Sequence, residues 1–532
     1  MDPATLSVAA SLVSQSYINQ GADALTRRHK LVKALLSTRR MPINGWDDAT
    51  IEMFLQDCSL MDSNNFIDNV GVGEREARVF SPLVSRRHYR LAHGIGRSGD
   101  VAAEQPKAAG SSLLVKVCNF LAADALRLAG MEHVGAVTVL PLATGMTVTM
   151  ALLALKTTRP PSARYVLWSR IDQKTCAKAV LAAGCELVVV PLVLQGDQLS
   201  TNLAQMEAEI DARGADNIVC VLSTTSCFAP RAADDVVALA KLCRARAVGH
   251  VVNHAYGVQS RRCCKEVTAA SRRGRVDAVI QSTDKNFLVP VGGAVLCASN
   301  DDPSLVDRVN KLYPGRACMA PLLDLLITLL SMGASGWEKL LTERERIYDY
   351  MAKKLAAVAN AHGERLLATP GNSISMGITL QTVETAAQND LEAFQSPTPS
   401  QSNQDDEKVK TELSHSPSQS TANDAKSKDS SPVFAAPAKA VTFIGSMLFS
   451  RSVSGVRTVP RGVTTSVAGV DFHGFGSSHD AYPTPYLTAA AALGTTEDDV
   501  DKFCIRLGEC LSDTHKKLAK NAKCWPSDLA HS

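Results

Sequence analysis

The sequence predicts an α/β fold: a large domain built on a mostly parallel sheet, a helical segment before it and a small α+β domain after it. Two observations carry this prediction. Apolar, β-branched runs alternate with helical patterns between about residues 110 and 330, and polar residues follow directly after several of these runs. Such alternation is typical of a parallel sheet covered by helices on both faces. The chain has 532 residues, 45% of them hydrophobic, enough for two or three domains with a large core.

The strands of the large domain are predicted from short apolar runs. They lie at 136–140, 164–168, 186–190, 218–222, 248–252, 278–281 and 295–298. Helical patterns separate most of them, at about 145–156, 173–183, 201–213 and 231–246. Because the carboxyl ends of parallel strands meet at one edge of a sheet, we expect the active site at that edge.

Shifts in composition divide the rest of the chain. Residues 1–45 form a helical segment, whose basic cluster at 27–40 is either a solvated helix face or a contact for phosphates. The large domain follows at 46–335. A helix at about 321–362, strands at 369–380 and 446–459 and a basic amphipathic helix at about 497–520 indicate a small domain at 336–383 and 440–520. A tail covers 521–532.

A low-complexity segment interrupts the small domain. Residues 384–439 consist mostly of Ser, Gln, Asp, Lys, Pro and Thr. Such a composition cannot bury enough apolar surface to offset the entropy of ordering. We therefore expect a disordered insertion in a surface loop.

Net charge and cysteine usage exclude several classes of protein. The net charge of +3 gives no global attraction to nucleic acid, so any such site must be a local patch. Fourteen cysteines without zinc-site spacing predict reduced thiols and a cytoplasmic protein without a metal site. No secretory signal opens the chain. The uncharged stretch 134–155 is long enough to span a bilayer, but Pro141 and Gly145 interrupt it, so we predict strand, loop and buried helix and no membrane span.

One lysine stands between two of the predicted strands. Lys285 follows an apolar run and precedes Pro290 and the pair Gly292-Gly293, after which the next strand begins. A scaffold at this position can hold an amine still and partly dry, as Schiff-base chemistry requires. The two glycines would let the backbone pass close to a ring or a phosphate. By itself, however, such a residue is more often a solvated turn lysine.

Three further segments end at the same predicted edge. Thr144 and Gly145 open a helix after the first strand, so their amides and the helix dipole favour an anion. Asn253 follows another strand, and the polar residues 223–226 follow a third. Each has a structural explanation when considered alone, such as a helix cap or a turn. Together with Lys285 they supply an anion cradle, a polar group for a ring and an amine, which are what pyridoxal 5′-phosphate needs.

The irregular segment 61–112 is rich in Asn, Gly, Arg and His, and such long irregular stretches are more often functional than not. It contains G-x-G-x-x-G at 94–99, but the charged run 86–90 precedes it where a dinucleotide site needs an apolar strand. We therefore reject a dinucleotide site. What remains is a glycine loop suited to a phosphate monoester, with Arg97, Ser98, Gln105 and Lys107.

With these segments described, the chain resembles the O-phosphoseryl-tRNA(Sec) selenium transferases, which are pyridoxal-phosphate enzymes of fold type I. The resemblance covers about residues 45–380 and 442–520. Long strings of low degeneracy carry it: Met61-Asp62-Ser63-Asn64-Asn65-Phe66, Gly71-Val72-Gly73-Glu74-Arg75-Glu76, Arg86-Arg87-His88-Tyr89-Arg90, residues 93–112, Arg170-Ile171-Asp172-Gln173-Lys174, residues 223–231, Asp284-Lys285-Asn286-Phe287 and Pro314-Gly315-Arg316-Ala317.

The resemblance implies roles for individual residues. Lys285 would carry the cofactor as a Schiff base, Arg75 would lie at the cofactor and Glu74 would filter substrates. The loop 96–106 would be the phosphate loop, and the phosphate of phosphoserine would be held by Arg97, Ser98, Gln105 and Arg316. Contacts with tRNA would come from Arg272, Arg451 and Lys516.

The resemblance also implies the reaction and the partners. The enzyme would eliminate phosphate from O-phosphoseryl-tRNA(Sec) and add selenium from selenophosphate. Lys285 would take the Cα proton, while the guanidinium groups of Arg97 and Arg316 would stabilise the departing phosphate. Family members are homotetramers whose amino-terminal segment takes part in assembly and tRNA capture, which suits the basic cluster at 27–40.

Two departures from the family pattern stand out, and two alternative functions stay open. The insertion 384–439 is long for the family, and His254 stands where we expect a second asparagine after Asn253. One alternative is a lyase or desulfurase of the same fold that acts on a free amino acid. A desulfurase needs a mobile cysteine, and none lies in an obvious flexible glycine loop. The other is a non-catalytic tRNA-binding scaffold, against which the retained Lys285, Arg75, Arg97 and Gln105 speak.

Overall fold

The central sheet has seven strands in the order β1-β9-β8-β7-β6-β2-β3. The structure, a computed structural model, describes residues 1–395 and 437–523. The neighbours from β8 to β3 run parallel, whereas β9 runs antiparallel to β8 and to β1. The predicted α/β fold with a mostly parallel sheet is confirmed. The strands are β1 (Val134–Leu140), β2 (Tyr165–Ser169), β3 (Glu186–Val190), β6 (Ile218–Thr224), β7 (Gly249–Asn253), β8 (Ala278–Ser282) and β9 (Ala294–Ser299).

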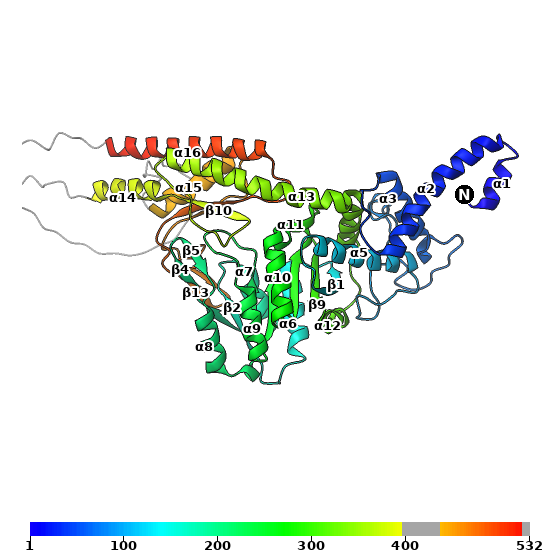
Figure 1. Ribbon diagram of the computed structural model, residues 1–532, viewed down its shortest axis with the longest axis horizontal. Helices are drawn as coiled ribbons and strands as arrows, with labels where there is room; N and C mark the ends of the chain where they lie inside the picture. The colour runs from blue at the N-terminus through cyan, green and yellow to red at the C-terminus, as the bar shows by residue number, and fades with distance from the viewer. Residues whose placement is uncertain (396–436, 524–532) are drawn as a thin grey trace, which may run out of the picture.

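Helices pack against this sheet (Figure 1). The four neighbouring strands β6 to β9 are buried along their whole length. Helix α6 lies against β6 to β9, α5 lies against β1, and α9 packs on α10. The covering helices are α5 (Ala109–Leu128), α6 (Thr144–Lys156), α7 (Lys174–Ala182), α8 (Leu203–Arg213), α9 (Val236–Ala245), α10 (Arg261–Arg273) and α12 (Ser304–Leu312). Helix α9 begins five residues later than the predicted 231, because Arg231 and Asp234 form a buried ion pair before it.

The amino-terminal helices α1 (Pro3–Ala9) and α2 (Gln15–Thr38) project from the body of the protein (Figure 1). Leu35 is the buried residue of α2. Helix α3 (Asp48–Leu60) begins where the Asp47 side chain accepts a hydrogen bond from the Thr50 amide, and it packs on α5. The irregular segment that follows holds the short helices η1 (Ser63–Asn65) and α4 (Pro82–Arg87).

The small domain has a three-stranded antiparallel sheet in the order β10-β14-β11. Its elements are β10 (Ser375–Thr379), β11 (Arg457–Val459), β14 (Tyr486–Ala490), α13 (Ala320–Ala361), α14 (Gln381–Gln395), α15 (Pro437–Ser450) and α16 (Glu497–Lys523). Helix α13 belongs to both domains and breaks at Gly333, where φ is +63° and a Cβ would lie 2.5 Å from the Gly45 nitrogen. The predicted boundary at 335/336 falls beside this break and stays a prediction. The described residues also form two short two-stranded sheets: β4 (Val193–Gln195) with β5 (Gln198–Ser200), and β12 (Thr465–Val467) with β13 (Val470–Phe472). The single helical turns are η2 (Ala215–Asn217) and η3 (Gly257–Gln259).

Two predictions about the small domain were wrong. The predicted strand at 446–459 begins inside α15, because Val441, Ile444 and Leu448 recur at helical spacing and are buried on one face. Only Arg457–Val459 of that range is a strand. The predicted insertion 384–439 is helical at both ends, up to Gln395 in α14 and from Pro437 in α15. Its remainder, 396–436, lies outside the described residues, as does 524–532 of the predicted tail.

Among residues 1–395 and 437–523, two helices are long and apolar enough to cross a membrane by length and composition, α5 and α13. Their apolar windows are 61% and 44% buried inside the fold, respectively. Both pack against each other and against β1, so they are core helices of this architecture. The stretch 134–155 forms β1, a loop and helix α6, which is mostly buried from Thr147 onward, as predicted.

Candidate active site

Lys285 lines two adjoining cavities beside the carboxyl ends of β7 and β8. The larger has a volume of about 350 Å³ and reaches the small domain at Arg457 and Ala490. The smaller, of about 200 Å³, reaches the start of α6. Both cavities share the residues Gln173, Asn253, Ala255, Asp284 and Lys285. We call the pair the lysine cavity.

The backbone around Lys285 is fixed by hydrogen bonds from its neighbours. Lys285 lies in the short helix α11 (Thr283–Phe287), directly after β8. The Asn286 amide group donates to the carbonyls of Ser282 and Ala255, at 2.7 and 2.8 Å. Gln259 Nε2 donates to the Lys285 carbonyl at 2.9 Å. Each bond uses a buried side chain, so the position of Lys285 is determined by residues that solvent does not reach.

The Lys285 ammonium is exposed to the cavity, 5.9 Å from the centre of the Tyr256 ring. The expectation that the amine is partly dry stays a prediction. The strand before Lys285 is buried, but α11 turns the side chain away from the core and into the open cavity. Tyr256 is half-buried, and the burial of its phenol raises the pKa of that group.

Asn253 ends β7 and is 93% buried at the boundary between the two cavities, with 7% of its surface exposed. Its Nδ2 lies 3.1 Å from Cys176 Sγ, and its Oδ1 accepts from the Ala255 amide at 3.2 Å. Burial raises the pKa of the Cys176 thiol to about 11, so this thiol stays protonated at neutral pH. These partners fix the orientation of the Asn253 amide toward the cavity.

The start of α6 forms the anion-binding end of the smaller cavity. Ala143 precedes the helix and provides no side-chain cap, so the first amides keep their hydrogen-bonding capacity. Thr144 and Gly145 line the cavity there. A Cβ on Gly145 would lie 2.4 Å from Thr175 Cγ2, so this position has no room for a side chain. A phosphate, a polar ring contact and a reactive amine can therefore be placed in one cavity, which fits pyridoxal phosphate.

The predicted phosphate-loop residues gather at a different place. Arg97 and Ser98 are exposed on the turn closed by the Arg97–Asp100 backbone bridge, and Gln105 is half-buried. Arg316 is half-buried beside them, with Nε and Nη2 buried and without a hydrogen-bond partner. Burial, and next the charge of Arg75, lowers the pKa of Arg316. An unpaired guanidinium of this kind is suited to bind an added anion.

Neither half of the lysine cavity is lined by Arg75, Glu74 or the predicted phosphate-binding residues. Glu74 and Arg75 are exposed on the loop that precedes α4. Nearby, Lys107 pairs with Glu76 at 2.5 Å, and this hydrogen bond lowers the pKa of Glu76. The single chain therefore brings Lys285, Asn253, Thr144 and Gly145 together, but it does not bring the phosphate loop to them.

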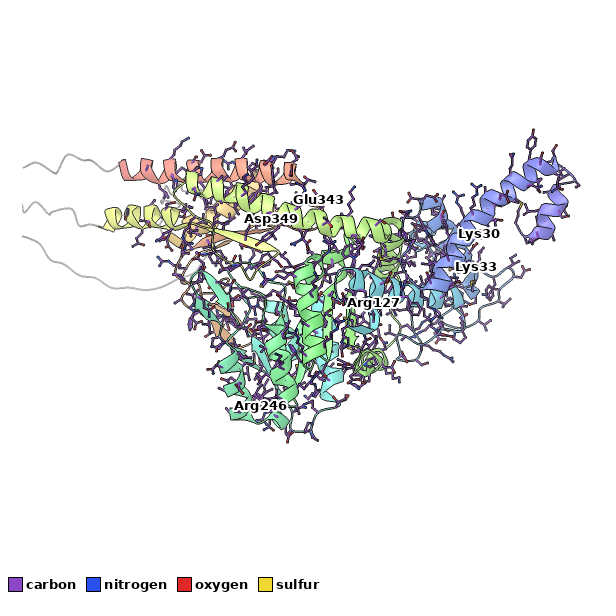
Figure 2. All side chains as sticks on the ribbon, viewed as in Figure 1. Lys30, Lys33, Arg127, Arg246, Glu343 and Asp349 are labelled. Carbon is purple, nitrogen blue, oxygen red and sulfur yellow. The ribbon has the colours of Figure 1, made fainter. Side chains whose placement is uncertain are left out.

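The predicted tRNA contacts also lie apart. Arg272 on α10 pairs with Glu132 at 3.2 Å. Arg451, at the end of α15, pairs with Asp513 of α16 at 2.7 Å, and the exposed Lys516 follows on the same helix. In the amino-terminal basic cluster, Lys30 and Lys33 are exposed on the part of α2 next to the body of the protein (Figure 2).

Several residues of the lysine cavity were not singled out from the sequence. Asp172 and Gln173 lie in one of the sequence strings that resemble the family. They belong to the loop between β2 and α7, and the sequence does not indicate that this loop reaches the cavity. Arg457 was assigned to a strand, and nothing in the neighbouring sequence indicates that it lines the same cavity as Lys285, 172 positions earlier. The segment 474–480 is held there because Asp172 accepts from the Gly476 and Ser478 amides, at 2.7 and 2.8 Å.

The fold and the lysine cavity define a pyridoxal-phosphate enzyme of fold type I. The family model for O-phosphoseryl-tRNA(Sec) selenium transferase matches residues 61–398 and 400–512 of the chain. The chain belongs to the O-phosphoseryl-tRNA(Sec) selenium transferase family.

Individual relatives agree with this assignment. The O-phosphoseryl-tRNA(Sec) selenium transferase of Dictyostelium discoideum is 41% identical over 516 residues, which cover 96% of this chain and 99% of the relative. A crystal structure of an archaeal O-phosphoseryl-tRNA(Sec) selenium transferase superposes with a TM-score of 0.76 at 24% identity, covering 94% of this chain and 98% of the other. The structure of Oryza sativa TDC with PLP shares the fold more distantly, with a TM-score of 0.50 at 13% identity and coverage of 94% and 98%. The predicted family, fold and enzyme class are thereby confirmed, with tRNA(Sec) as the partner that the family name implies.

Proposed function

We propose that this enzyme converts the phosphoserine of O-phosphoseryl-tRNA(Sec) to selenocysteine, with selenophosphate as the selenium donor. The observation that carries the proposal is the placement of Lys285, Asn253 and the uncapped start of α6 around one cavity in a member of this family. Family membership supports the substrate, and the cavity supports the chemistry. We place the enzyme in the cytoplasm, where its tRNA substrate is available.

In this proposal the residues of the chain divide the work of elimination. Bound pyridoxal phosphate supplies an electron sink for the charge left when the Cα proton is removed. Lys285 would hold the cofactor covalently, and its free amine would take that proton. The amides at Thr144 and Gly145 would hold the cofactor phosphate, and Asn253 would contact its ring.

The departing phosphate is assigned to the phosphate loop. The Cβ–O bond breaks as the Cα proton goes to Lys285, and the phosphate leaves with the electron pair. Arg97 and Arg316 stabilise the dianion with charge-assisted hydrogen bonds, while Ser98 and Gln105 orient it. The unpaired guanidinium atoms of Arg316 support this role. The selenium of selenophosphate then adds at Cβ, Cα takes back a proton, and water cleaves the Se–P bond, which releases a second phosphate.

We further propose that the active enzyme is a homotetramer in which the phosphate loop of one copy meets the lysine cavity of another. The separation of the two groups in one chain supports this arrangement. An exposed apolar patch on the segment next to Glu74 and Arg75 supports it as well, since such a surface is costly in an isolated chain. The patch consists of Phe66, Ile67, Val70, Val72, Phe80 and Leu83. We assign Arg75 to the cofactor and Glu74 to substrate filtering in that assembled site, and Arg272, Arg451 and Lys516 to tRNA.

The alternative of a desulfurase gains one feature from the structure, since Cys318 is exposed two residues after Arg316. This cysteine does not line the lysine cavity. Turnover of free cysteine or free phosphoserine without tRNA would favour the alternative.

The first test is the visible absorbance of the purified protein before and after borohydride, with peptide mapping of the reduced adduct. We expect a pyridoxyl group on Lys285, and an adduct on Lys174 would refute the assignment. A protein without cofactor absorbance would favour the non-catalytic scaffold. The second test is Arg97→Ala, which should abolish selenium transfer while the cofactor absorbance stays, because Arg97 contacts phosphate and not the cofactor. Full activity of this variant would remove the phosphate-loop assignment.

A further inference from the structure

A groove of about 420 Å³ lies in the small domain directly beside the lysine cavity. Its walls are the segment 452–456, the end of β14 with the residues after it, and the first turns of α16. Ala490 and Ala492 line both the groove and the larger half of the lysine cavity. We call it the α16 groove, and these two alanines form the wall that it shares with the active site.

Two cations of α16, Lys502 and Arg506, line the groove one helical turn apart. Arg506 Nη1 donates to the Ser452 carbonyl at 3.2 Å, and its guanidinium has no ion pair with any carboxylate in the described parts of the chain. Lys502 pairs with Asp498 at 2.5 Å in an exposed bridge, which leaves its ammonium available to a second anion. Asp499 also lines the groove, but its carboxylate is used by the amide and hydroxyl of Thr496.

A third cation continues this line toward Lys285. Arg457 follows the groove segment directly and lines the larger half of the lysine cavity. Its guanidinium lies 4.8 Å from the centre of the Phe228 ring, and no ion pair with a carboxylate is present among residues 1–395 and 437–523. Arg506 therefore lines the groove, and Arg457 and Lys285 line the active-site cavity on the other side of the shared alanines.

The groove segment leaves its backbone open. Ser454 and Gly455 are exposed, and a Cβ on Gly455 would meet no atom within 4 Å. Gly455 also has a φ of +86°, which favours glycine. A groove with cations can bind the phosphates of a single-stranded nucleic acid, and small residues beside the cations let its backbone approach closely.

We propose that the α16 groove seats the unpaired 3′ end of the tRNA substrate. The phosphates of this strand contact Arg506 and Lys502, and the terminal nucleotide passes Arg457 as its phosphoserine enters the lysine cavity. The proposal rests on the proposed function, because it assumes an amino acid esterified to the 3′-terminal ribose. It adds the route by which that ester reaches Lys285.

The experiment compares binding of intact tRNA(Sec) with binding of the same tRNA lacking its unpaired 3′ end. Charge-assisted hydrogen bonds to a phosphate are worth about 1.5–3 kcal/mol, so Arg506→Ala should weaken binding of the intact tRNA about 10- to 100-fold. It should leave the affinity for the truncated tRNA unchanged. Lys241→Ala, an exposed lysine on α9, removes the same charge far from the groove and should change neither affinity.

A second variant protects the test against misfolding. Ser454→Trp fills the groove without removing a charge, and it too should weaken only the intact tRNA. Cofactor absorbance and the melting temperature are measured for each variant. Equal weakening of intact and truncated tRNA by Arg506→Ala, or no effect of either variant, would overturn the proposal. Binding is measured without turnover, so an enzyme that holds the 3′ end but transfers no selenium would refute the proposed function and leave this inference standing.

Discussion

The ion pair of Arg231 and Asp234 offers a quantitative test of how the active-site edge is held. Both side chains are only 1% exposed. Asp234 accepts from Arg231 Nη2 at 2.9 Å, from the Thr224 amide at 2.7 Å and from the Ser169 hydroxyl at 2.7 Å. It thereby ties the ends of β2 and β6 to the turn that carries Ser226 and Phe228 into the lysine cavity.

We expect Asp234→Asn to lower the free energy of unfolding by about 3–5 kcal/mol. The substitution keeps the shape of the side chain but leaves the Arg231 guanidinium buried without an opposite charge, which is the cost measured when one partner of a buried pair is removed. The matched control is Asp307→Asn, which removes the partner of Lys311 in an i,i+4 pair whose side chains are 71% and 66% exposed. That change should cost no more than about 0.5 kcal/mol.

The assay is urea unfolding of the cofactor-loaded enzyme, followed by circular dichroism and tryptophan fluorescence. Replacing both residues, as Arg231→Met with Asp234→Leu, should cost less than Asp234→Asn alone, because no charge then stays buried. A cost below about 1 kcal/mol for Asp234→Asn would refute the reasoning, since it would mean that water reaches Arg231. Additive costs in the double variant would refute it as well.

Two further predictions follow from the same edge. Burial lowers the pKa of His254 from 6.5 to about 3, so below pH 6.5 the unfolded chain binds a proton that the folded chain does not. Stability should therefore fall by about 1.4 kcal/mol per pH unit below 6.5 on account of this group. In His254→Asn the urea midpoint should depend less steeply on pH between 6.5 and 5. The same pH dependence in both proteins would contradict this. Gly145→Ala places a Cβ against Thr175 and should weaken cofactor binding about tenfold in an absorbance titration. Gly21→Ala, where a Cβ meets nothing within 4 Å, should have no effect, and cofactor affinity unchanged in both variants would argue against the cradle.

Local patterns were reliable where a single physical requirement dominated. The buried strands β6 to β9 need continuous apolar runs, and these runs were found within one or two residues of their bounds. Predictions failed where tertiary contacts decided. The segment 446–450 is helical because the residues at 441 and 444 pack on the same face of one helix. Helix α14 extends to Gln395, and its residue Glu384 pairs with Arg461 at 2.6 Å.

The sequence by itself determined the fold class and the family, because these depend on residue types and short spacings along the chain, and it predicted which lysine carries the chemistry. Only the tertiary structure decided which of these residues meet. It placed Asn253, Thr144 and Lys285 around one cavity and kept Arg97 and Arg316 outside it. It also brought Arg457 and the α16 groove beside Lys285, although Arg457 is 172 positions away in sequence. Contacts of this separation arise from the packing of the small domain on the sheet edge, which no local pattern encodes.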